Sequence, residues 1–105
     1  MIICIIEFET RPGMEEEQKK WLDKLMPRVE KFSGFHGKES YAHLSGDGRV
    51  NTVSYWENEN ALLNWTRDPE HQEAMSAGKK QIFSRYSITI CEELRRYEHV
   101  ANQVS

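Results

Sequence analysis

The sequence predicts a single α+β domain of ferredoxin-like βαββαβ topology, an antiparallel four-stranded sheet with helices on one face. One observation is the order of patterns, in which strand-like and helix-like segments follow as strand, helix, hairpin, helix, strand. A second is length, because 105 residues suffice for one two-layer core and no repeat or linker divides them. A third is composition, since 38% apolar and 30% charged residues are typical of a globular protein.

The first strand is expected over Ile2 to Thr10, where β-branched residues dominate. A turn signal follows at residues 11–13. Apolar residues then recur at spacings of one, three and four, which predicts a helix from Met14 to Phe32. Its apolar face consists of Trp21, Leu22, Leu25, Met26, Val29 and Phe32. Pro27 is expected to kink or break this helix, and Ser33-Gly34 to end it.

Two strands, Phe35 to Leu44 and Val50 to Trp56, are expected to form a hairpin around residues 45–49. The helical segments that follow are predicted to start at two N-caps, Asn58 and Asp68, the second with a proline in the first turn. Gly78 is the expected stop of the second segment. The last strand is predicted over Phe83 to Leu94. We assign residues 1–97 to the domain and 98–105 to a polar tail.

Two helices cover only one face of such a sheet, and the first strand is apolar on both faces. Ile2, Cys4, Ile6 and Phe8 line one face, whereas Ile3 and Ile5 lie on the other. Each large apolar side chain left in water forgoes about 1.5–3 kcal/mol of burial. We therefore expect a homodimer in which a partner sheet covers this face; the alternative is a monomer whose C-terminal tail folds over it.

Charge and cysteine content exclude several function classes. A net charge of −3, with basic residues interleaved among acids, predicts no nucleic-acid partner. The longest apolar run is far shorter than the roughly 20 residues of a membrane span, so we expect no membrane partner. No secretory leader is recognisable, and a cytoplasmic location is expected. Cys4 and Cys91 are interpreted as small buried hydrophobes.

The second half of the chain resembles a known family. The run YWENENALLNW at residues 55–65 matches that family's tryptophan, acidic residue, alanine, tryptophan pattern. DPEHQEA at 68–74, GKK at 78–80 and YSITICE at 86–92 extend the match, and Pro12-Gly13 and Gly34-Phe35 fit the same template. The chain thus resembles, over about residues 2–97, the antibiotic biosynthesis monooxygenase (ABM) domain family, a branch of the dimeric α/β-barrel superfamily.

This resemblance implies a homodimer whose two sheets enclose a barrel, with a pocket between sheet and helices in each subunit. Members include cofactor-independent oxygenases of aromatic phenols and quinols, and haem-degrading enzymes. The haem branch resembles this chain at Trp65, but its histidine ligand falls at Met75 and its strand-one asparagine near Ile6. Because a methionine would be an unusual substitute for that imidazole, the sequence argues against haem degradation.

The oxygenase branch needs an aromatic wall, a proton acceptor and a group that stabilises the deprotonated substrate. The resemblance makes Trp65 the candidate wall and Arg85 the anion stabiliser, with His71 or Asn64 as relay. We therefore expect a cofactor-independent monooxygenase of a small aromatic phenol or quinol, with no cofactor and no metal. A non-catalytic dimeric module that binds a small apolar ligand or signals stress is the alternative, and haem degradation the second alternative.

Overall fold

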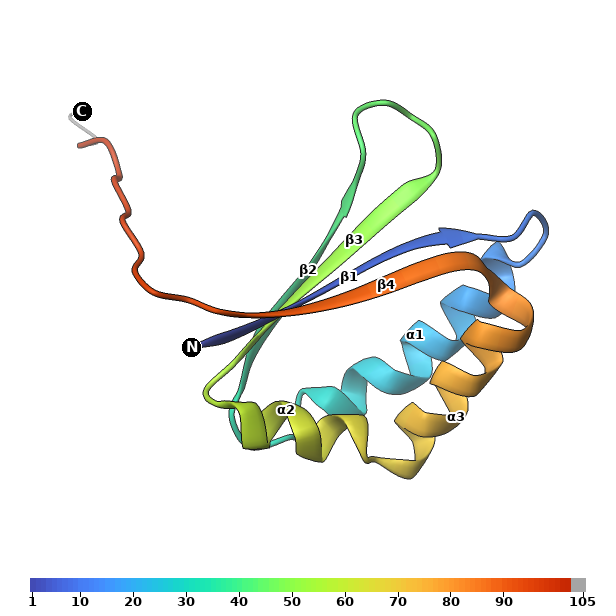
Figure 1. The fold of residues 1–105 in the computed structure, drawn as a ribbon, viewed down its shortest axis with the longest axis horizontal. Helices are drawn as coiled ribbons and strands as arrows, with labels where there is room; N and C mark the ends of the chain where they lie inside the picture. The colour runs from blue at the N-terminus through green and yellow to red at the C-terminus, as the bar shows by residue number, and fades with distance from the viewer. Residues whose placement is uncertain (103–105) are drawn as a thin grey trace.

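The computed structural model describes residues 1–102, in which the strands and helices follow the predicted order (Figure 1). The elements are β1 (Ile2–Thr10), α1 (Glu15–Val29), β2 (Phe35–Ala42), β3 (Arg49–Trp56), α2 (Glu59–Thr66), α3 (Pro69–Ala77), a π-helical turn η1 (Gly78–Ile82) and β4 (Phe83–Glu92). No helix in this described part is long and apolar enough to cross a membrane.

The four strands form one sheet in the order β2-β3-β1-β4, and every neighbouring pair is antiparallel. All helices lie on one side of this sheet (Figure 1). The predicted ferredoxin-like topology is therefore confirmed. Within the single chain the sheet is open and does not close into a barrel, because β2 and β4 remain edge strands.

The core lies between the helices and one sheet face, here called the helix-facing side. Register places Cys4 opposite Ser54 and Ile90, and Ile2 opposite Trp56, so these side chains share that side. The core cluster comprises Cys4, Val29, Trp56, Ala61, Leu62 and Trp65. The predicted apolar face of α1 contributes to it, because Val29 is buried and Leu25, Met26 and Phe32 pack against the cluster.

Both predicted N-caps are confirmed. The side chain of Asn58 accepts a hydrogen bond from the Ala61 N–H at 2.9 Å, and Asp68 accepts one from the His71 N–H at 3.2 Å. Each cap satisfies a donor that the first turn of a helix would otherwise leave unpaired. The chain therefore turns sharply between α2 and α3, and this corner fixes where α3 begins.

The end of the first helix differs from prediction. The helix α1 runs through Pro27 and ends at Val29, before the expected stop at Ser33-Gly34. The helix α3 ends at Gly78 as predicted, and the chain continues from there as the π-helical turn η1 to Ile82. The φ of Gly78 is −58°, so it is not a left-handed cap; a Cβ there would lie 2.8 Å from the Phe83 ring. Close packing explains this glycine better than capping.

Gly34 combines the two conditions that favour glycine, a left-handed backbone conformation and close contact with a neighbouring element. Its φ is +85°, a left-handed conformation that other residues rarely adopt, and a Cβ would stand 2.6 Å from the Cβ of Ala61. Gly34 also accepts a backbone hydrogen bond from Glu57 at 2.8 Å. The predicted end of the first helix is thus the point where the α1–β2 connection touches α2.

The other sheet face, here called the open face, carries no helix. It is apolar toward one end, where Ile3, Ile5 and Tyr55 lie, and polar toward the other, where Glu7 lies 3.1 Å from His43 and 3.6 Å from Arg49. The chain beyond β4 continues the pairing with β1 by one residue: the Glu93 N–H bonds to the carbonyl of Met1.

The end of the chain then leads away from the sheet (Figure 1). The guanidinium of Arg96 lies 5.7 Å from the Tyr55 ring centroid, but Leu94, Tyr97 and Val100 are more than 80% exposed. Arg96 of the described tail therefore lies over part of the open face, whereas these three exposed side chains do not pack on it. Residues 103–105 of the expected tail lie outside the described residues.

Candidate functional site

A cavity of about 210 Å³ lies between the helix-facing side of the sheet and the helices. Most of its walls are aliphatic or aromatic, with Trp21, Trp56 and Trp65 among them. Its polar lining residues are Gln18, Lys38, Thr52, Ser54, Thr66, His71 and Tyr86. The lining contains no Asp, Glu or Arg within residues 1–102. An apolar hollow with a few convergent polar groups is the usual form of a small-molecule site.

Trp65 and His71 meet in this cavity although they belong to different helices. Their rings are stacked, with centroids 4.4 Å apart and planes inclined by 22°. Trp65 is buried and also packs against Phe32 in an edge-to-face arrangement, with the two ring centroids 5.0 Å apart. The corner between α2 and α3 brings the two together, because Asp68 caps the turn that carries His71.

His71 has the features of a proton acceptor. Its Nδ1 is buried and has no hydrogen-bond partner within the described chain. Burial lowers the pKa of the imidazole, and the positive charge of Lys38 acts in the same direction. Interactions of the ring with the backbone of Trp65 and Thr66 and the charge of Asp68 oppose this shift of the pKa. The ring is therefore neutral at neutral pH, with a lone pair available to a ligand proton.

Asp68 is held in turn by Arg28 of α1. The guanidinium donates from Nε to Oδ2 at 3.1 Å and makes a second, shorter contact to Oδ1. This two-point interaction is the main reason that the pKa of Asp68 lies below its ordinary value. Glu70 is also within 3.3 Å of the Arg28 guanidinium. The pair joins α1 to the start of α3 and so steadies the helix that presents His71.

Lys38 enters the cavity because β2 contains an irregularity. Phe35 pairs with Trp56, but Gly37 pairs with the next residue of β3, Tyr55, so one residue of β2 is extra. Simple alternation from Phe35 would put Lys38 on the open face, whereas the shifted register pairs it with Ser54 on the helix-facing side. Burial lowers the pKa of its amine.

Hydroxyl and thiol groups line the sheet wall of the cavity. Thr52 is buried and shares a 3.0 Å hydrogen bond with Ser40, and Trp56 donates from Nε1 to the Ser54 hydroxyl at 2.9 Å. Burial raises the pKa of the Cys4 thiol, which is therefore protonated at neutral pH. Cys4 is thus the small buried side chain that the sequence predicted, whereas Cys91, predicted to be buried as well, is only half-buried.

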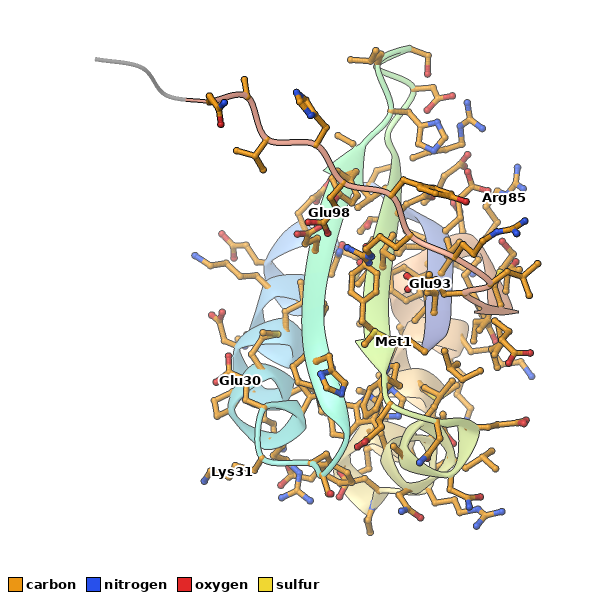
Figure 2. All side chains as sticks on the ribbon, turned by 90° about the vertical axis from the view of Figure 1, so that its left-hand side faces the viewer. Met1, Glu30, Lys31, Arg85, Glu93 and Glu98 are labelled. Atoms are coloured by element: carbon orange, nitrogen blue, oxygen red, sulfur yellow. The ribbon has the colours of Figure 1, made fainter. Side chains whose placement is uncertain are left out.

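Of the four site residues predicted from the sequence, the structure brings two together, Trp65 and His71. Asn64 is exposed on α2 and does not line the cavity. Arg85 pairs in register with Glu9, which places it on the open face, and its side chain extends away from the sheet edge in Figure 2. The roles predicted for Asn64 and Arg85 stay predictions, and the cation that lines the cavity is Lys38.

The cavity opens toward the edge strand β4. Tyr86, Ile88 and Ile90 line it and are 41%, 43% and 53% exposed. Leu22 of α1 and Met75 of α3 complete this apolar rim, each slightly over one-third exposed. The cavity is thus most open to solvent along β4.

Comparison with known proteins finds a match to the family model described as antibiotic biosynthesis monooxygenase, over residues 1–77. The chain is 36% identical over 59 residues to the uncharacterized protein YqjZ of Bacillus subtilis, a match that covers 56% of this chain and 50% of YqjZ. It is 23% identical over 90 residues to the jasmonate monooxygenase ABM of Pyricularia oryzae, covering 86% of this chain and 42% of that protein. The chain thus spans half or less of the length of these curated relatives.

Solved structures show the same fold. SnoaB, a cofactor-independent oxygenase from Streptomyces nogalater, superposes with a TM-score of 0.78 at 9% identity, covering 93% of this chain and 97% of SnoaB. At that identity the likeness concerns the fold.

Proposed function

The chain belongs to the antibiotic biosynthesis monooxygenase family, and on that premise we propose that it is a cofactor-independent monooxygenase of a small aromatic phenol or quinol. The observation that carries the proposal is the Trp65–His71 stack, with a buried and unpartnered Nδ1 at the wall of an apolar cavity. The name of one similar protein, the jasmonate monooxygenase ABM of Pyricularia oryzae, supports the reaction class.

The proposed reaction begins with the transfer of a proton from the substrate to His71. The O–H bond of the phenol breaks, and an N–H bond forms at Nδ1 of His71, because the neutral imidazole is a competent base. The phenolate is electron-rich and reduces O₂ directly. One oxygen atom adds to a ring carbon and the other leaves as water, so a phenol with a free ring position gives a quinone: ArOH + O₂ yields quinone and H₂O.

The remaining lining residues orient the ring and exclude water. The indole of Trp65, which lines the cavity beside His71, gives a substrate ring an aromatic surface to pack against. The hydroxyl groups of Thr52 and Ser54 line the opposite wall of the cavity on the sheet. With no carboxylate in the described lining, a phenolate formed here meets no like charge from the protein.

Haem degradation does not fit the cavity. Met75 stands where the family resemblance implies a histidine ligand, and it is 37% exposed at the rim. The imidazole of His71 is held face-on against Trp65. The volume of about 210 Å³ also falls below the roughly 300–1,000 Å³ of cofactor and drug-sized sites.

We also propose that the protein is a cytoplasmic homodimer joined through the open face. Ile3, Ile5, Val53 and Tyr55 share that face and are half-buried, and of the described tail Arg96 lies over the Tyr55 ring. Leu94, Tyr97 and Val100, which are exposed beyond β4, offer further apolar surface to a second copy. Cys4 and Cys91 are free thiols, which favours a reducing compartment.

Oxygen uptake tests the proposed function. With a panel of phenols and quinols, the wild-type protein is expected to consume one O₂ per substrate oxidised. His71→Gln keeps a polar side chain but removes the base, and is expected to lower the rate by about 10²–10⁴-fold. His36→Gln, at an exposed position on β2, is the matched control and is expected to leave the rate unchanged.

Two outcomes contradict the proposal: uptake no higher than without protein, or equal rates for wild type and His71→Gln. Tight ligand binding without oxygen uptake would instead identify a non-catalytic binding module, for which the largely apolar lining is the supporting observation.

A further inference from the structure

We propose that the ammonium group of Lys38 binds the ionised oxygen of the ligand, so that the cavity selects an apolar ring compound carrying one negative charge. This inference rests on the proposed function and names the substrate class of the same site. Phenolates and aromatic or alicyclic carboxylates share the required chemistry, one anionic oxygen group on an apolar body.

The placement of Lys38 is the first step. A lysine on a half-buried strand ordinarily extends its amine to water, but the extra residue in β2 turns this one toward the helices and into the cavity lining. Its Nζ reaches the Met26 sulfur at 3.6 Å. A thioether is a weak acceptor and carries no charge, so this contact leaves most of the amine's capacity unused.

The absence of a carboxylate partner is the second step. Within residues 1–102 Lys38 forms no ion pair, although eight such contacts link other side chains of the described chain. Charged groups buried among apolar walls are normally paired, because desolvation disfavours the charge. Burial lowers the pKa of this amine for that reason. A ligand anion would supply the missing partner.

The charge of the whole lining is the third step. His71 and Cys4, two further titratable groups of the lining, are neutral at neutral pH, since burial lowers the pKa of the imidazole and raises the pKa of the thiol. Lys38 is then the one cation of a described lining that holds no Asp, Glu or Arg. One positive charge in apolar walls complements a monoanion, whereas a dianion would leave a charge unpaired.

The dimensions of the cavity restrict the ligand further. An apolar cavity of about 150 Å³ accommodates a benzene molecule. The cavity here, at about 210 Å³ and open at β4, accepts one ring fully and lets a second ring or short chain extend past Ile88 and Ile90. For a phenol, Lys38 stabilises the oxygen anion that remains after the proton has moved to His71.

Binding without oxygen separates this inference from the proposed function. Under nitrogen, affinity is measured by tryptophan fluorescence for 2-naphthoate and for its neutral isostere 2-naphthamide. The wild-type protein is expected to bind the carboxylate at least tenfold more tightly. Lys38→Met is expected to abolish this preference while retaining the affinity for the amide, which shows that the cavity is intact. Lys38→Arg is expected to restore part of it.

Lys31→Met is the matched control, since Lys31 is exposed beyond the end of α1 and points away from the cavity (Figure 2). A second arm uses 2-naphthol, whose ionised form has its own absorption band. Bound 2-naphthol is expected to ionise at a lower pH than free 2-naphthol in the wild type and the control, but not in Lys38→Met.

The inference is overturned if the wild type shows no preference for the anion, including the case in which neither naphthalene ligand binds, or if Lys38→Met keeps the preference. A response to 2-naphthoate alone assigns the site to carboxylates, and a response to 2-naphthol alone assigns it to phenols; each supports anion recognition. Anion binding without oxygen uptake in air contradicts the proposed oxygenase and leaves the role of Lys38 standing. If the wild type shows no anion preference and Lys38→Met leaves the rate of oxygen uptake unchanged, the role of Lys38 is contradicted and the proposed oxygenase stands.

Discussion

The carboxylate of Asp68 accepts a hydrogen bond of 3.2 Å from the backbone N–H of His71, so the residue that starts α3 also fixes the imidazole that faces the cavity. The same carboxylate is bound by Arg28 of α1. Two helices therefore hold the segment that carries the proposed proton acceptor, and the Asp68 side chain that links them is itself buried. The predictions about His71 and Asp68 follow from this arrangement.

The decrease of the oxygen-uptake rate at acidic pH should reflect protonation of His71. Because burial lowers its pKa, the imidazole stays neutral to a lower pH than an ordinary histidine, whose pKa is about 6.5. The rate of oxygen uptake should therefore remain constant as pH falls through 6.5 and decrease only below it. A pH profile of kcat/KM measures this; a limb centred above 6.5 would contradict it. The control is the substrate's own spectrophotometric titration, which identifies any limb that belongs to the ligand.

Asp68→Asn should lower stability in a pH-dependent way. Asparagine keeps the cap but loses the charge that binds Arg28. Because the folded-state pKa of Asp68 is depressed, its ionised form stabilises the wild type above the unfolded pKa of about 3.9, and this contribution is lost as pH falls through the lower folded value. The difference in Tm between wild type and variant should thus be largest near pH 7 and shrink toward pH 2. A constant difference would show that the charge is not the cause.

Gly34→Ala and Gly13→Ala form a matched pair for the close approach of two connections. Both glycines have φ of +85°, but only at Gly34 would a Cβ collide, 2.6 Å from Ala61 Cβ. Each substitution should cost about 1–2 kcal/mol for the left-handed backbone, and Gly34→Ala about 1–3 kcal/mol more for overpacking. Urea denaturation at neutral pH measures both. Equal losses of unfolding free energy in the two variants would mean that the α1–β2 connection at Gly34 shifts to admit the extra Cβ without strain.

Val53→Arg should prevent self-association. Val53 pairs with Ile5 in the centre of the open face, where a proposed second copy would bury a charge without a partner. Sedimentation of the wild type should show about twice the 12.4 kDa chain mass, and the variant a single-chain mass. Gln81→Arg, exposed on the opposite side in η1, is the control and should not change the mass. A wild-type particle of one chain at micromolar concentration would contradict the dimer.

Much of the fold is predictable because local patterns determine it. The β-branched residues of β1 locate that strand, and Asn58 and Asp68 locate the starts of α2 and α3, because their side chains bond within their own turns. The predicted helix end at Gly78 is confirmed, since α3 ends at Ala77, but Gly78 is not a left-handed cap. The constraint on this glycine is its contact with the Phe83 ring, where the chain enters β4. No single-segment pattern contains that contact.

The candidate site is only half predictable. The family resemblance identifies Trp65 and His71, but their stacking depends on the angle between two short helices. Lys38 escapes prediction because one extra residue in β2 reverses the alternation that begins at Phe35. The glycine at position 37 is the available signal, since glycine inside a strand often marks such an irregularity. For Arg85, alternation from Tyr86 already puts the side chain on the other side of the strand from the cavity.

The rim formed by Tyr86, Ile88 and Ile90 turns toward the helices, whereas the surface proposed for self-association is the reverse side of the same sheet. Occupying one cavity would therefore leave the neighbouring protomer's entrance untouched. With no described element linking the two entrances, saturation should be hyperbolic with a Hill coefficient of about one. The two protomers of such a dimer would bind and convert substrate independently of each other.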